Sequence, residues 1–271
     1  YVAVFNMVRE AYVEPVDDAT LMQSAIRGLL QDLDPHSAYL AADASANLQE
    51  RTRGAYEGIG VEMQRRQDGT LRVIAPIDDT PAARAGIQAG DLIVAVDGKP
   101  VEEAGNDPLR GPPGSEVTLT IAREGRDDTF DVTVQRETIR VPSIRARMLE
   151  PGFGYARIAM FQADTGADFA RAIDTLEAES GGPLRGLVID LRSNPGGLLT
   201  TAVQVADELL ERGTIVSTRG RLAISDTTFS ATPGDRLDGA PVVVLVDAGS
   251  ASASEVLAGA LRDNDRARVV G

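Results

Sequence analysis

The chain has 271 residues, 43% of them hydrophobic and 25% charged, which is ordinary for a globular protein of two or three structural units. Its formal net charge of −14 argues against a nucleic-acid partner, and it has no apolar run long enough to span a membrane. Because it has no Cys and only one His, thiol catalysis, Cys-ligated zinc and an HExxH metal site are excluded, and we expect neither metal nor cofactor.

The N-terminal part of the chain, residues 1–55, is predicted to be a helical segment. Apolar residues recur at helical spacing after Thr20, the expected cap, and a second short helix is expected near 45–52. Between these helices "DLDPHSAYL" (32–40) predicts a turn, because proline disfavours helix in the residue before it. Since the chain begins with Tyr1 rather than Met, we expect a mature or trimmed chain that would not reveal an upstream signal peptide or anchor.

Residues 56–141 are predicted to form a small β-rich module. Apolar and polar residues alternate on both sides of Asp68-Gly69, as in a β-hairpin, and a second hairpin is expected to turn at 124–126. Two further strands are expected on either side of Asp97-Gly98. One short helix is predicted by Thr80 at the cap and Pro81 at the first helical position.

Residues 142–271 are predicted to form a mixed α/β core, because strand and helix patterns alternate along them. The expected strands are 154–161, 186–191, 242–246 and 267–270, and the expected helices are 163–179, 200–213 and 253–263. Apolar strands that alternate with helices predict a sheet with parallel crossovers, covered by helices on both faces.

Two of these strands end in residues that suit chemistry. "GLVIDL" runs into "RSNPGG" (192–197), and "VVVLV" runs into "DAGSASASE" (247–255). Ligands bind beyond the carboxyl ends of strands in such sheets, glycines let backbone N–H groups approach them, and a serine at a helix N-terminus lies in a partial positive field. Together the two motifs offer the nucleophile and the oxyanion donors that acyl transfer needs. Each motif alone is better explained by a tight loop, a helix cap or close packing.

A serine nucleophile also needs a base, and the chain offers few candidates. His36 would serve in a Ser-His-Asp arrangement, but it lies in a turn of the helical segment, where a structural role suits it better. Lys99, the single lysine, would serve in a Ser-Lys arrangement, but it follows a hairpin turn, where exposed lysines are common. The residues therefore predict a nucleophile without an evident base.

Four motifs in register resemble the carboxyl-terminal processing peptidases, also called tail-specific proteases. They are "DPHSAYL", "GIGVEM" opening a module that ends in "VTVQRETIRVPS", "LVIDLRSNPGGLLTTAVQVADELL", and "GSASASE" followed by "VLAGALRDNDRARVVG". The resemblance covers essentially the whole chain in the order of the family. It implies an α/β multidomain protein: a helical N-terminal segment, an inserted PDZ-like module, and an α/β sandwich core that resembles the crotonase-like and ClpP-like fold.

The resemblance also implies roles for individual residues. The nucleophile of a Ser-Lys dyad corresponds to Ser252, and the oxyanion-hole amides correspond to Ala253 and to either Gly196 or Gly197. The family's base lysine follows the serine by about 25 residues, with a supporting glutamine beyond it, so both would lie past Gly271. As written, the 271 residues are therefore expected to be inactive.

In the PDZ-like module the resemblance assigns the peptide-carboxylate loop to "GIGV", that is Gly58, Ile59, Gly60 and Val61. The side chains of Ile59 and Val61 are expected to flank the pocket for the last apolar residue of a peptide. One departure from the family concerns "GKPVEEAGNDPLRGPPG" (98–114), which is shorter than usual and contains Pro and Gly. The helix that normally flanks the peptide groove is therefore expected to be short or irregular.

The leading hypothesis is a serine endopeptidase that recognises the C-terminal tails of protein substrates through its PDZ-like module. The resemblance implies an extracytoplasmic location, periplasmic in a Gram-negative bacterium, and protein substrates with apolar C-terminal tails as partners. An adaptor or activating protein and a homo-oligomer stay open. The alternatives are a non-catalytic peptide-binding scaffold with a degenerate core and, more weakly, a Ser-His hydrolase that uses His36.

Overall fold

The computed structural model describes residues 2–105 and 107–271, except for the side chains at positions 43 and 223. Position 106, in the segment expected to be irregular, lies outside the described residues. The chain forms two compact units, one that ends at Glu50 and one that runs from Arg51 to Gly271. The predicted boundaries at 55 and 141 stay predictions.

The first unit is helical, as predicted. Its helices are α1 (Val2–Ala11), α2 (Asp18–Gln31) and the start of α3 (Ala42–Arg53). The expected cap was wrong by one turn: the carboxylate of Asp17 accepts a hydrogen bond from Thr20 N at 3.0 Å, so Thr20 lies inside α2. The turn at 32–40 is confirmed, since Asp34 Oδ1 accepts hydrogen bonds from the backbone N–H groups of His36 (2.7 Å) and Ser37 (2.8 Å).

The helices α1 and α2 have no core of their own: none of their described side chains is buried. Their apolar residues instead line an open groove of about 430 Å³. The groove is lined by Val2, Val4, Phe5, Val8, Leu21, Met22, Ala25, Ile26 and Leu29.

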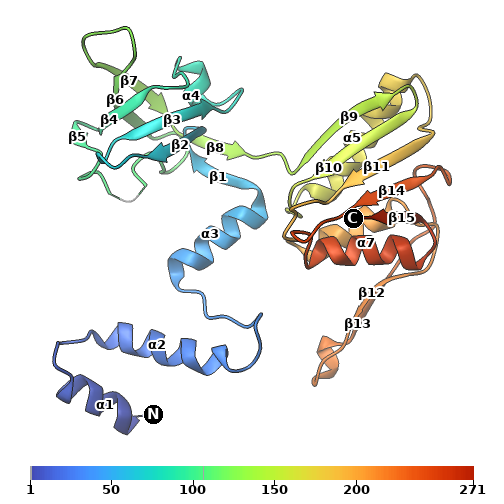
Figure 1. Cartoon of the computed structure of the whole chain (residues 1–271), viewed down its shortest axis with the longest axis horizontal. Helices are drawn as coiled ribbons and strands as arrows, with labels where there is room; N and C mark the ends of the chain where they lie inside the picture. Colours follow the sequence, from blue (N-terminus) through green and yellow to red (C-terminus); the bar gives the residue numbers. More distant parts are fainter. Residues whose placement is uncertain (1, 106) are drawn as a thin grey trace. The chain divides into compact units, whose positions relative to one another are not determined.

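The β-rich module is a six-stranded antiparallel sheet (Figure 1), with β2 at one edge, the order β2-β3-β4-β6-β7, and β5 paired to β4. Its strands are β2 (Val61–Arg65), β3 (Leu71–Pro76), β4 (Leu92–Val96), β5 (Lys99–Pro100), β6 (Glu116–Ala122) and β7 (Phe130–Gln135). The predicted hairpins are confirmed, and so is the short helix α4 (Pro81–Arg84). A ladder between β1 (Ala55–Gly58) and β8 (Glu137–Arg140), which was not predicted, joins the two ends of the module.

The α/β core is built on a five-stranded sheet of order β15-β14-β11-β10-β9, in which only β9 is antiparallel to its neighbour. The strands are β9 (Ile144–Glu150), β10 (Phe153–Ile158), β11 (Gly186–Asp190), β14 (Val242–Leu245) and β15 (Ala267–Val270). The parallel crossovers are α5 (Thr165–Ser180), α6 (Leu199–Asp207) and α7 (Ala253–Asp263). They confirm the predicted alternation of strands and helices, although β9 was not predicted.

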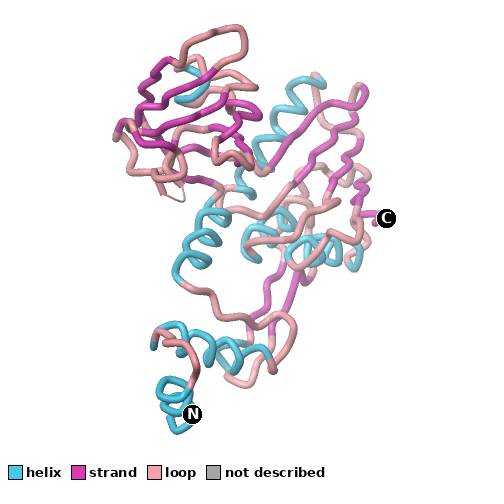
Figure 2. The backbone as a smooth tube through the Cα atoms, turned by 60° about the vertical axis from the view of Figure 1, so that its left-hand side comes forward, coloured by secondary structure: helices cyan, strands magenta, loops and turns pink. Residues whose placement is uncertain are grey.

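A second unpredicted feature is the two-stranded ribbon of β12 (Thr214–Thr218) and β13 (Thr227–Ser230), which carries a 3-10 turn, Ala223–Ser225, near its tip. The ribbon projects from the core sheet in both views of the backbone (Figure 1, Figure 2).

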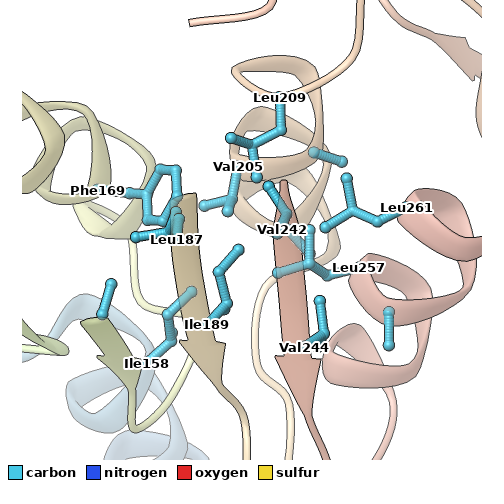
Figure 3. Packing of buried hydrophobic residues seen from close by; sticks show 14 of the residues in the cluster. Ile158, Phe169, Leu187, Ile189, Val205, Leu209, Val242, Val244, Leu257 and Leu261 are labelled. Atoms are coloured by element: carbon cyan, nitrogen blue, oxygen red, sulfur yellow. The ribbon is translucent and has the colours of Figure 1, made fainter. Parts of the chain in front are cut away.

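The core sheet is covered by helices on one face only. Ala156, Ile189 and Val244 are paired across β10, β11 and β14, so they share a face, and all are fully buried. Figure 3 shows side chains from α5, α6 and α7 converging on this face. Tyr155 and Val188, on the opposite face, are half-buried. The expectation of helices on both faces is therefore wrong for the residues that the structure describes, because every crossover helix packs on the same side.

Candidate active site

The two predicted motifs meet beyond the carboxyl ends of β11 and β14, which are adjacent parallel strands. Their loops are tied together through Asn194, whose backbone oxygen accepts hydrogen bonds from Ala251 N and from Ser254 Oγ, both at 3.0 Å. The Asn194 side chain is itself buried and donates to the Ile158 carbonyl at 2.9 Å. The loop of residues 192–197 is thus fixed against the serine loop by the two hydrogen bonds to the Asn194 backbone oxygen, of which the bond from Ser254 is buried.

The three serines have different surroundings. Ser250 Oγ donates to the Leu191 carbonyl at 2.8 Å, and Ser254 Oγ is fully buried against Asn194. Ser252 is exposed, and its hydroxyl donates to no acceptor among the described residues. Two of the serines therefore hold loops in place, while the Ser252 hydroxyl is accessible to a substrate.

Ser252 has an unusual backbone conformation, with φ 54° and ψ −116°, at the N-cap of α7. Non-glycine residues in such regions cost about 1–3 kcal/mol and persist where the surroundings enforce them. Here Ser252 N donates to Glu255 Oε2 at 2.6 Å, and Ser252 O accepts from Val256 N at 3.1 Å. Ser252 is therefore a helix cap, as one alternative held, but it is a strained cap that presents its side chain at a sharp strand-to-helix turn.

The two glycines of the loop differ in what their amides do. Gly196 is buried, and its N–H donates to Asn194 Oδ1 at 2.9 Å. A Cβ on Gly196 would lie 2.8 Å from Ser252 Cβ and 2.9 Å from Ala253 N, so this backbone approaches the serine turn as closely as a glycine allows. Gly197 is exposed, and its N–H has no acceptor among the described residues.

Ala253 supplies a second unused amide. It is the first residue of α7 and is 2% exposed. The first N–H groups of a helix have no acceptor within the helix, and they lie at the positive end of its dipole. Because Gly196 packs against Ala253 N, the loop and the helix N-terminus lie next to one another and together form a site suited to an anionic oxygen.

Asp247 links the same two loops at the surface. Its carboxylate accepts hydrogen bonds from Ser193 N at 2.7 Å, Gly249 N at 2.9 Å and Ser193 Oγ at 3.1 Å. The bond from the Ser193 N–H is the main reason that the pKa of Asp247 lies below its ordinary value. Ser193 itself has φ 58°, so this carboxylate helps to hold a second strained residue.

Asp190, the last residue of β11, anchors the start of the glycine loop. Its carboxylate is fully buried and accepts hydrogen bonds from Arg192 Nη2 at 2.7 Å and from the Tyr155 hydroxyl at 2.6 Å. These bonds, from Arg192 above all, hold the pKa of Asp190 well below its ordinary value. Arg157 Nη2 donates to the Arg192 carbonyl at 3.1 Å and completes the cluster.

Sequence reasoning missed Asp190, Asp247 and Asn194. A signal for Asp190 was present, since an acidic residue in the apolar strand "GLVIDL" must find partners if it is buried. Asn194 lies inside a motif that was recognised for its glycines. Nothing in the sequence indicates which backbone groups Asp247 would bind.

The predicted peptide loop lies between β1 and β2. The carbonyl of Ile59 accepts from Ala82 N at 2.8 Å, and that of Gly60 accepts from Ile77 N at 3.0 Å. Ile59 is 1% exposed and belongs to the core of the module, so it offers its backbone rather than its side chain to a ligand. The loop borders a cavity of about 140 Å³, into which Gly58 and the half-buried Val61 also face.

The remaining candidates lie on exposed surfaces. His36 lies in the first unit, in the turn held by Asp34, and Lys99 lies in the short strand β5. Among residues 2–105 and 107–271, no group of acidic and histidine side chains could hold a metal ion. Within the same residues, no helix is both long and apolar enough to cross a membrane.

Comparison with known families assigns each part of this architecture. The model of peptidase family S41 matches residues 152–271, the PDZ domain model matches 57–134, and the activating protease CtpB N-terminal domain model matches 2–44. The chain thus has the domains of a PDZ-containing serine-type peptidase, with the glycine and serine loops in the S41 domain.

The chain belongs to the carboxy-terminal processing proteases. It is 42% identical to the carboxy-terminal-processing protease of Bartonella bacilliformis, a match that covers 99% of this chain and 62% of the relative. It is 37% identical to the probable CtpA-like serine protease of Staphylococcus aureus (99% and 54% covered) and 30% identical to CtpA of Bacillus subtilis (98% and 57% covered). The chain therefore spans between about half and two thirds of the length of these relatives.

Among solved structures, the chain is similar to a photosystem II D1 C-terminal processing protease. The two are 31% identical with a TM-score of 0.49, over 99% of this chain and 79% of the other. A PDZ domain of the carboxy-terminal protease from Vibrio cholerae, solved in complex with a peptide, is 30% identical over 32% of this chain, with a TM-score of 0.29.

Proposed function

We propose that the protein is a serine endopeptidase in which Ser252 is the nucleophile and its PDZ domain recognises the C-terminal tails of substrates. The observation that carries the proposal is the strained, exposed Ser252 at the N-terminus of α7, next to backbone amides without acceptors. Strain of this kind is commonly maintained at functional sites.

The proposed chemistry is acyl transfer. Ser252 Oγ attacks the carbonyl carbon of the scissile bond and gives its proton to a base, which passes it to the departing amine. The developing oxyanion accepts hydrogen bonds from Ala253 N and from Gly197 N. We favour Gly197 over Gly196 as the loop donor, because the Gly196 amide already serves Asn194. Water then hydrolyses the acyl-enzyme, and Ser252 is regenerated.

The general base stays a prediction drawn from the resemblance: a lysine about 25 residues after Ser252, which would lie past Gly271. Such a lysine must be neutral to accept a proton, which burial in an apolar pocket favours because burial lowers its pKa.

The test is turnover by the protein as its gene encodes it, with an unstructured protein that ends in an apolar residue as substrate. Ser252→Ala is expected to lower kcat at least about a thousandfold, as loss of a nucleophile does elsewhere. Ser254→Ala, which removes a buried hydrogen bond at the same loop, is the matched control and is expected to retain more activity. An equal loss in both variants would show that the wrong serine was chosen.

Self-association through the N-terminal unit is part of the proposal. Met22 and Leu29 are each 51% exposed on the apolar groove of α1 and α2, and a second copy carries the same apolar surface. Met22→Glu with Leu29→Glu is expected to shift the chain to monomer in sedimentation experiments. An unchanged mass would contradict this part. We also propose an extracytoplasmic location, on the strength of the family resemblance alone.

The competing function, a peptide-binding scaffold with a degenerate core, fits the lack of an evident base within the 271 residues but does not account for the site at Ser252. A scaffold has no need to maintain a strained serine beside unused amides. It would be supported if Ser252→Ala left all proteolysis unchanged while peptides still bound.

A further inference from the structure

The peptide groove of the PDZ domain runs along the edge strand β2 and begins at the amides of Ile59 and Gly60. Strand β2 is the edge of its sheet, so its outer backbone groups are available to an added strand. The carbonyls of Ile59 and Gly60 are bonded inward, and their N–H groups have no acceptor among the described residues. These amides suit the carboxylate at the end of a peptide chain.

The cavity beside these amides is small, and its walls are partly apolar and partly polar. Val61 and Met63 line it from β2, two positions apart and therefore on one face of the strand. Tyr56 and Leu109 also line it, together with the charged residues Asp107 and Arg110. Its volume of about 140 Å³ is close to that of an engineered cavity of about 150 Å³ that holds one benzene ring. The cavity therefore fits a single side chain, the last one of the peptide.

Beyond this cavity, the described residues provide no helix that could form a second wall of the groove. The segment that follows β5 makes a turn at 101–103 and another at Pro108–Leu109, and no helix forms in its described residues. Glu102, Glu103 and Gly105 are all exposed. The expectation of a short or irregular helix is confirmed in that no helix forms among the described residues of this segment. A strand bound along β2 would thus find no helix, among the described residues, opposite its upstream side chains.

The missing helix cannot readily form when a peptide binds, because the buried side chain of Arg136 holds the segment in its present shape. The guanidinium donates to the carbonyls of Leu109 (3.1 Å), Pro108 (3.1 Å) and Glu116 (2.9 Å). Arg136 is 8% exposed, so a rearrangement that broke these bonds would leave a buried cation without acceptors.

From these observations we propose that this PDZ domain reads only the free carboxylate and the last side chain of a polypeptide. In β-strand addition, pockets for alternate side chains provide specificity. Here one pocket is built, and no helix among the described residues lies opposite the position for the side chain two residues upstream. The substrate class is then any unstructured chain with a small or medium apolar last residue, whatever precedes it. This inference deepens the tail recognition of the proposed function and rests on it.

The test is fluorescence anisotropy of the 271-residue chain with a labelled neutral ten-residue peptide that ends in valine. Amidation of the terminus, or replacement of the last valine by aspartate, is expected to weaken binding at least tenfold. The peptide carries alanine two residues before its last valine. Replacement of this alanine by valine, threonine or phenylalanine is expected to change Kd less than twofold. A tenfold change on any of these neutral upstream replacements would overturn the proposal.

Two variants of β2 locate the site. Met63→Asp is expected to weaken binding at least tenfold, since Met63 lines the cavity and is 36% exposed. Gln64→Asp adds the same charge on the other face of the strand and is expected to leave Kd within twofold. Equal effects would overturn the assignment of the cavity. Binding needs no catalysis, so if no peptide binds, tail recognition fails while the role of Ser252 is still decided by turnover.

Discussion

Replacement of Asp190 by asparagine tests whether the glycine loop depends on its buried carboxylate. Asn has the same shape but cannot accept on both sides: its NH₂ group would face the donors that now share one oxygen, Arg192 Nη2 and the Tyr155 hydroxyl. We expect Asp190→Asn to destabilise the α/β core and to loosen the loop that carries Gly197.

The magnitude follows from burial. Removal of one partner of a buried ion pair costs about 3–5 kcal/mol when the other charge stays buried. Asp190 is fully buried, but the Arg192 side chain is 50% exposed and can turn to water. We therefore expect the low end, about 3 kcal/mol, for Asp190→Asn.

The effect should depend on pH in one direction. The pKa of Asp190 is lowered in the folded state, so its stabilisation is present above the ordinary value of about 3.9 and is lost as the pH falls towards the folded value. The difference between parent and variant is thus expected to be constant from pH 5 to 7 and to shrink below about pH 4.

The assay is hydrogen exchange in increasing urea, measured by mass spectrometry for peptides of α5, α6 and α7. These peptides report on the core alone, which matters because a chain of several units need not unfold in one step. The control is Asp174→Asn, which breaks the ion pair between Asp174 and Arg236. Because the Asp174 side chain is 63% exposed, this substitution should cost less than about 1 kcal/mol. Equal costs for the two variants would refute the reasoning from burial.

Three further predictions concern the loops and the PDZ domain. Gly196→Ala should lower the melting temperature far more than Gly181→Ala. Both glycines have positive φ, but only a Cβ at Gly196 would lie 2.8 Å from other atoms, so equal shifts would contradict this prediction. Asp247→Ala should lower the melting temperature at pH 7 and speed exchange of the Ser193 amide, and the difference should narrow below about pH 4, since the pKa of Asp247 is lowered in the folded state. A difference that grew in acid would exclude that account. Arg136→Met should destabilise the PDZ domain by about 2 kcal/mol in urea, because it leaves carbonyls without donors; unchanged stability and unchanged peptide affinity would show that the segment needs no such support.

Local patterns predicted the parts of the fold that depend on local physics. Asp68-Gly69 and Asp97-Gly98 turn the chain where expected, because Asp-Gly pairs adopt hairpin conformations that few other pairs tolerate. Thr80-Pro81 begins α4 for a similar reason, although Thr80 Oγ1 bonds to the carbonyls of Gly60 and Ile77 rather than to the helix. The parallel order of β10, β11, β14 and β15 follows from the alternation of apolar strands with helices.

The features that were missed depend on contacts between distant residues. The strand β9 alternates Arg145 and Arg147 with smaller residues, a pattern that is weak until Tyr155 and Arg157 lie beside it on β10. The one-sided cover of the sheet was hidden for a related reason. Val188 and Val243 are apolar enough to indicate burial, yet they are paired on the face that no crossover helix covers.

The site shows the same division, and it clarifies what the 271 residues contribute. Local patterns did not choose among three serines and two glycines; the family resemblance indicated Ser252 but left Gly196 and Gly197 open, because that choice depends on which amides are already bonded. Ser250, Ser254 and Gly196 each use their groups to hold a loop, which leaves Ser252 and Gly197 with groups to spare. Those bonds need no base and no substrate. In the proposed mechanism the donors for the oxyanion are therefore in place before any proton moves, and preorganised donors of this kind supply a large share of the rate enhancement in acyl transfer. It follows that loss of the base should abolish turnover without disturbing Ser252, whereas loss of Asn194 should disturb the donors even when a base is present.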